Sequence, residues 1–67
     1  MENVKLNIRA LASMKKISIE VLAKNAGIEP NHLLNVSAGR ATFTASDLMK
    51  LVKYTKVPAE NINVDEP

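Results

Sequence analysis

The stretch GIEPNHLLNVSAGR, from Gly27 to Arg40, gathers side chains that can hydrogen-bond a planar ligand. Asn31 and Asn35 are four residues apart, so they share one face if the stretch is helical. An asparagine amide can donate to N7 and accept from N6–H of adenine, a pairing that discriminates between bases by about 1–3 kcal/mol. His32 lies beside them and can donate to a base or a phosphate. The alternative is that both asparagines are solvated and His32 packs over the preceding helix.

The charge distribution favours an anionic partner for most of the chain. Its 67 residues have a net charge of +2. Residues 1–59 hold all nine lysines and arginines against four acids, which leaves +5 there and −3 on Glu60, Asp65 and Glu66. We therefore expect one basic domain, residues 1–62, and a short acidic tail, residues 63–67.

Several classes of protein are disfavoured by composition. The absence of cysteine argues against a disulfide scaffold or a cysteine-rich zinc module and favours the reducing cytoplasm. No apolar run approaches the roughly 20 residues that cross a bilayer, so we expect a cytoplasmic protein with no membrane contact. One histidine and no facing carboxylate pair predict no enzyme, no metal site and no cofactor, since Glu29 and His32 alone do not make a site.

Helical spacing of apolar residues predicts an all-α fold of five helical segments. We place them from Val4 to about Lys15, from Ser18 to about Ala26, from Pro30 to Gly39, from Ala45 to about Lys56, and in a last turn at Pro58. Asn3, Ser18 and Thr44 are the expected N-caps, and Gly27 is an expected C-cap. The alternating segment ISIEV competes as a strand, but LAKNAG follows it without a turn residue, which favours a helix start.

The same spacing predicts which side chains face the core. The predicted core residues are Val4, Ile8, Leu11 and Ala12 in the first segment; Leu22, Ala23 and Ala26 in the second; Leu33 and either Val36 or Ser37 in the third; and Ala45, Leu48, Met49, Leu51 and Val52 in the fourth.

The segment LAKNAGIEPNHLLNVSAGR matches the pattern L-A-x-x-x-G-[VI]-x-x-x-x-[IL]-x-x-x-x-x-G. In this it resembles the Cro-type, lambda-repressor-like helix-turn-helix domains of the XRE family, and the resemblance covers roughly residues 4–62. It implies a compact five-helix domain in which the second and third helices form the helix-turn-helix. It further implies a sequence-specific transcriptional regulator, a repressor of phage or bacterial style, that inserts its third helix in the major groove of double-stranded DNA as a homodimer.

The resemblance also implies roles for individual residues. The positions that read bases correspond to Pro30, Asn31 and Asn35, with His32 beside them. The positions that contact phosphates correspond to Ser18, Arg40, Thr42 and Thr44. Looser phosphate candidates are Lys24, Lys50 and Lys53, for which a solvated charge is the alternative.

The chain departs from the family pattern where the DNA should lie. Ile19 stands where glutamine is usual, Ser37 where glutamate is usual, and Leu34 at a position that is usually polar. Glu29 replaces serine or threonine and would repel phosphate unless it reads a cytosine amino group.

A second hypothesis therefore stays open, namely a helix-turn-helix relative that binds a protein, such as an antirepressor or an antitoxin. Its interface would use the apolar side chains of Ile19, Val21 and Leu34. The expected dimer surface lies elsewhere, at Val57, Ile62 and Val64, which we expect so small a monomer to leave exposed.

Overall fold

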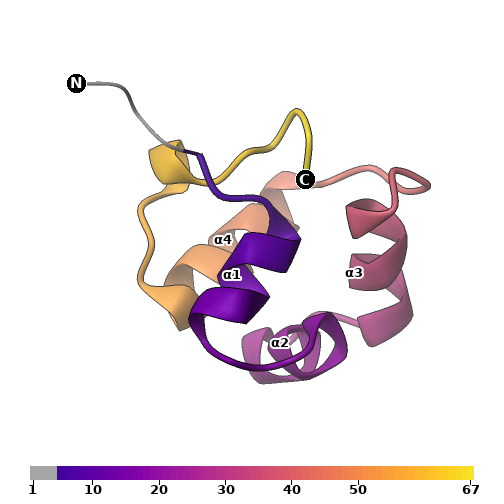
Figure 1. The fold of residues 1–67 in the computed structure, drawn as a ribbon. Coiled ribbons are helices and arrows are strands. Elements are labelled where there is room, and N and C mark those ends of the chain that lie inside the picture. The colour runs from indigo at the N-terminus through magenta and orange to yellow at the C-terminus, as the bar shows by residue number, and fades with distance from the viewer. Residues whose placement is uncertain (1–4) are drawn as a thin grey trace.

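The computed structural model describes residues 5–67, which form four α-helices and one short 3₁₀ helix (Figure 1). The elements are α1 (Ile8–Met14), α2 (Ile19–Ala26), α3 (Pro30–Ser37), α4 (Ala45–Thr55) and the 3₁₀ helix η1 (Ala59–Asn61). The predicted all-α class is confirmed, and the fifth predicted segment is a single 3₁₀ turn. In Figure 1, α1 and α4 cross the middle, α2 lies below them and α3 stands to one side.

Local capping chemistry sets most of the helix ends where the sequence predicts them. Ser18 caps α2, with its Oγ accepting the Val21 N–H at 3.2 Å. Gly27 ends α2 in the left-handed region at φ 81°, which a residue without a Cβ adopts at little cost. Thr44 caps α4, and Pro30 occupies the first turn of α3. Residues 19–21 are helical, so the strand alternative for ISIEV is excluded.

The first helix begins later than predicted. Asn7 caps α1, its Oδ1 accepting an N–H of the first turn at 2.7 Å, and the predicted cap Asn3 and start Val4 lie outside the described residues. Before Asn7, Leu6 forms an isolated parallel bridge with Ile62. The prediction of a helix at residues 5–6 is therefore wrong, because Leu6 pairs with the distant residue Ile62.

The predicted acidic tail folds back onto the start of α1 (Figure 1). Asn63 Oδ1 accepts the amides of Asp65 and Glu66 at 3.1 and 2.9 Å, which closes a turn. Beyond the turn, the carbonyl of Pro67 accepts the Ile8 N–H at 2.7 Å. Residues 63–67 therefore satisfy a backbone amide at the N-terminus of α1, one of the four that a helix leaves without an internal partner.

One small core joins all four α-helices. Its fully buried large side chains are Ile8, Leu11, Leu22, Leu33, Val36, Leu51 and Ile62. Burial of each such side chain contributes about 1.5–3 kcal/mol, which makes this cluster the main source of stability in a domain of this size. The predicted inward row of α4 is wrong at Met49, whose side chain is 71% exposed, and at Ala45, which is also exposed.

The predicted dimer surface is also wrong in part. Ile62 is only 1% exposed and belongs to the core, while Val57 packs against the core as a partly buried side chain. Only Val64 remains exposed among the three. The monomer can bury Ile62 because Leu6 pairs with it.

We expect Ile62→Ala to lower the free energy of unfolding by about 2–5 kcal/mol, because it leaves a cavity in the core. The matched truncation Val64→Ala removes an exposed side chain and should cost less than about 1 kcal/mol. Urea unfolding followed by circular dichroism measures both. Equal effects of the two variants would contradict the placement of Ile62 in the core.

Candidate functional site

The outer face of α3 carries both asparagines singled out in the sequence. Leu33 and Val36 are fully buried, which fixes the rotation of α3 about its axis. Asn31, Leu34 and Asn35 are exposed on the other side. At 3.6 residues per turn, Asn31 and Asn35 are separated by only about 40° around the helix, so their amides project in nearly the same direction. The prediction that they share one exposed face is confirmed.

The N-terminus of α3 is capped by an acid. The Glu29 carboxylate accepts the Asn31 N–H at 3.2 Å and the His32 N–H at 2.9 Å, and Pro30 has no N–H to offer. These amides are therefore engaged by a side chain of the protein, and a negative charge stabilises this end of the helix. This role for Glu29 was missed, although a proline in the first helical turn points to the preceding residue as the cap.

His32 faces α4. Its Nε2 lies 2.8 Å from Oδ2 of Asp47, and its side chain is about one-third exposed at 35%. Asp47 is buried and forms a capping box with Thr44: Oδ2 accepts the Thr44 N–H at 3.1 Å, and Thr44 Oγ1 accepts the Asp47 N–H at 3.1 Å. One carboxylate therefore joins the first turn of α3 to the first turn of α4.

The electrostatics of Asp47 follow from these contacts. Burial raises the pKa of its carboxyl, whereas the hydrogen bonds from His32 and Thr44 lower it, and the net result is a pKa below the usual value.

The sequence left open that His32 packs over the preceding helix. In the structure its ring contacts Asp47 of α4 instead. Asp47 itself was missed, although Thr44 followed three residues later by an acid is a capping signal.

The remaining phosphate candidates lie on loops and at helix starts. Arg40 and Thr42 are exposed on the loop from α3 to α4, and the Arg40 N–H donates to the Asn35 carbonyl at 2.7 Å, which folds the loop back on α3. Ser18 and Thr44 use their hydroxyl oxygens as cap acceptors. A capping hydroxyl keeps its own proton, so both residues can still donate to an anion.

Two of the three apolar interface candidates are exposed. Val21 on α2 is 40% exposed and Leu34 on α3 is 41% exposed. Ile19 packs against the core as a partly buried side chain and is therefore only partly available to a partner. Leu34 is therefore an exposed apolar side chain that adjoins Asn35 in the sequence of α3.

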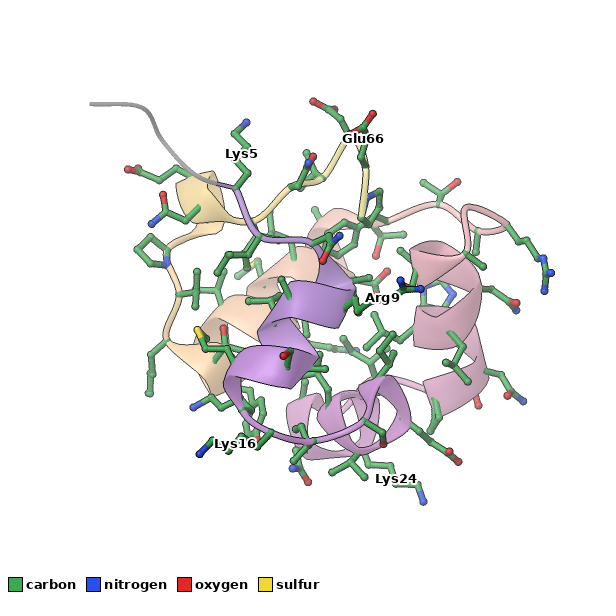
Figure 2. The ribbon with its side chains drawn as sticks, in the orientation of Figure 1. Lys5, Arg9, Lys16, Lys24 and Glu66 are labelled. Atoms are coloured by element: carbon green, nitrogen blue, oxygen red, sulfur yellow. The ribbon has the colours of Figure 1, made fainter. Side chains whose placement is uncertain are left out.

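The lysine and arginine side chains of the described residues lie outside α3. The sequence of α3 contains no lysine or arginine. Figure 2 shows Lys24 projecting from α2, while Lys5 stands at the side of the molecule away from α3. Within residues 5–67, no lysine or arginine lies within 4.0 Å of a carboxylate. His32 with Asp47 is the one contact there between a basic and an acidic side chain. These cations are available to bind anions.

Comparison of the chain with protein-family models, with curated proteins and with solved structures finds no match. Within residues 5–67, no helix is long and apolar enough to cross a membrane. The same residues contain no group of three or more histidine or acidic side chains that could hold a metal ion.

We expect Asp47→Asn to lower the free energy of unfolding at pH 7 by about 1–3 kcal/mol, because it weakens a buried, charge-assisted hydrogen-bond network. The folded-state pKa of Asp47 is lowered, so its contribution is present above the unfolded-state pKa of about 4 and is lost as pH falls through the folded value. The stability difference between parent and variant should therefore shrink between about pH 5 and pH 2.

Urea unfolding at several pH values measures this difference. Asp65→Asn, which removes an exposed carboxylate in the C-terminal turn, is the matched control and should show little change at any pH. A gap between parent and Asp47→Asn that stays constant with pH would contradict the role given to the Asp47 charge.

Proposed function

We propose that this protein is a sequence-specific DNA-binding regulator that inserts the outer face of α3 in the major groove. The observation that carries the proposal is that Asn31 and Asn35 are exposed in nearly the same direction on a helix whose inner side is fully buried. A helix whose buried side fixes its rotation presents both amides to the same side, which is suited to base edges. Residues 27–29 form the short turn between α2 and α3, which pack against each other, as expected for a helix-turn-helix.

Each part of this surface has a distinct task under the proposal. Asn31 and Asn35 pair with adenines, and Pro30 lies at the end of the helix that enters the groove. Arg40, Thr42, Thr44 and Ser18 hold phosphates on either side. The protein acts as a homodimer on a two-fold operator and modulates transcription by occupying it.

The family resemblance and the basic charge of residues 5–59 support the same proposal. The first test is a fluorescence-anisotropy titration of the protein with labelled duplex DNA of mixed sequence, at low and at physiological salt. Affinity that falls steeply with salt supports phosphate contacts, because each releases condensed counterions. Failure to bind at low salt contradicts the proposal. Selection from random duplexes then identifies the preferred site.

On the selected duplex, Asn31→Ala and Asn35→Ala should each lower affinity about tenfold to a hundredfold, because each removes a bidentate base contact. Their affinity for mixed-sequence DNA and their helical circular dichroism should change little. Asn61→Ala, in η1, is the control and should bind the selected duplex like the parent. If Asn31→Ala and Asn35→Ala both bind the selected duplex as tightly as the parent, these residues do not read bases.

Arg40→Ala should weaken binding to every sequence and reduce the slope of log K against log salt by about 1, because one phosphate contact is lost. Lys5→Ala makes the same change of charge on the side away from α3 (Figure 2) and should leave the slope close to that of the parent. Titrations over a range of salt concentrations measure both slopes. A similar loss of slope in both variants would show a general charge effect in place of a contact at Arg40.

A second candidate function is binding of a protein partner by the same surface, as in an antirepressor or antitoxin. The observations that favour it are the exposed apolar side chains of Val21 and Leu34 and the acidic cap Glu29 at the start of α3. Apolar side chains on an otherwise polar face are typical of protein interfaces, and a carboxylate beside the groove opposes phosphate.

The double variant Val21→Gln, Leu34→Gln separates the two candidates. Under the DNA proposal it should bind the selected duplex within about threefold of the parent, because neither side chain carries a base hydrogen bond. Under the protein-binding alternative it should lose a partner that the parent retains in a pull-down. Anisotropy and pull-down on the same two proteins give both results. Ile19 is left unchanged because its contact with the core would confound the comparison.

A further inference from the structure

A second exposed apolar surface lies on α4, and it shares no residue with the outer face of α3. Its apolar lining, called its floor below, consists of Leu48, Met49 and Val52 of α4 and Ala59 of η1. Its polar lining consists of Ser46, Lys50 and Lys53. We call these seven residues the α4 groove; its volume is about 820 Å³.

The groove exists because α4 has apolar side chains on two sides. Leu51 faces the core and is fully buried, whereas Met49 is the most exposed large apolar side chain described, at 71%. Leu48 and Val52 are only partly buried and lie between the two sides. A methionine in an open groove can adapt its unbranched, flexible side chain to the shape of a partner.

The positive charge of the groove favours some binding partners over others. Lys50 and Lys53 are its only charged side chains, and neither lies within 4.0 Å of a carboxylate among the described residues. A second copy of the chain docked on the same surface by two-fold symmetry would bring Lys50 and Lys53 of both copies into one interface that has no carboxylate among its lining residues, and like charges repel. DNA would attract the lysines but would leave the apolar floor exposed to water or covered by phosphates.

We propose that the α4 groove binds an acidic amphipathic helix of a partner protein. Apolar side chains of the partner, spaced by three or four residues, fill the floor between Leu48, Met49 and Val52. Carboxylates on the flanks of the same helix pair with Lys50 and Lys53 and so fix its position and direction. Because the groove and the outer face of α3 have no residue in common, this proposal stands whether or not α3 binds DNA.

The experiment starts from a displayed library of helical peptides. Apolar positions vary among leucine, isoleucine, methionine and phenylalanine, and the flanking positions vary among glutamate, lysine, glutamine and serine. Peptides are selected on the parent protein after removal of those that also bind Met49→Glu, which places a charge in the floor. We expect glutamate to be enriched over lysine at the flanking positions.

A charge swap then tests the pairing. The best acidic peptide should bind the double variant Lys50→Glu, Lys53→Glu at least about tenfold more weakly than it binds the parent, and its glutamate-to-lysine counterpart should prefer that variant. Lys5→Glu, Lys16→Glu makes the same change of net charge outside the groove and should bind the acidic peptide like the parent. Isothermal titration calorimetry measures affinity, and thermal unfolding verifies that each variant is folded. Lys50→Gln, Lys53→Gln replaces the reversed variant if that one does not fold.

Four results would overturn the proposal. They are the absence of any peptide that depends on Met49, enrichment of lysine or of neither charge at the flanks, self-association of the parent that Met49→Glu abolishes, and binding to vesicles of anionic phospholipid that Met49→Glu abolishes. Sedimentation velocity and vesicle co-sedimentation provide the last two measurements. Self-association would show that the groove binds a second copy of the chain, and vesicle binding would show that it binds a lipid surface.

Discussion

The burial of Leu33 and Val36 is the constraint on which the candidate site depends. Turning α3 enough to expose both would cost about 3–6 kcal/mol, a large share of the stability of a small domain. This cost fixes the rotation of the helix, and the rotation determines that Asn31 and Asn35 face outward with Leu34 beside them. The same packing therefore creates both the polar surface suited to base edges and the apolar element that favours a protein partner.

A second constraint acts at the start of the helix, where His32 meets the buried carboxylate of Asp47. Because Asp47 also caps α4, the start of α3 and the start of α4 are held by one group. The sequence predicted the face of α3 through helical spacing, but it did not predict this contact, since nothing local relates residues 32 and 47. The role of Glu29 as a cap could have been predicted from the sequence, because a proline at the first position of a helix marks the residue before it as the N-cap.

The fold was predictable where local chemistry determines it. Ser18, Gly27 and Thr44 act at helix ends through bonds that span a few residues, and their predicted roles are confirmed. The start of α1 and the burial of Ile62 were predicted wrongly for one shared reason. Leu6 pairs with Ile62 from a distant part of the chain, which keeps Leu6 out of the helix and moves an expected surface residue into the core. Periodicity carries no information about such distant pairs.

The α3 face and the α4 groove can be distinguished by following backbone amide signals in ¹⁵N-labelled protein while duplex DNA of mixed sequence is added at low salt. If α3 is the recognition helix, the largest changes occur at residues 31–35 and 40–45, and the signals of residues 48–53 move little. Changes concentrated on residues 48–53, or no changes at all, would contradict the assignment of α3 as the DNA-reading element.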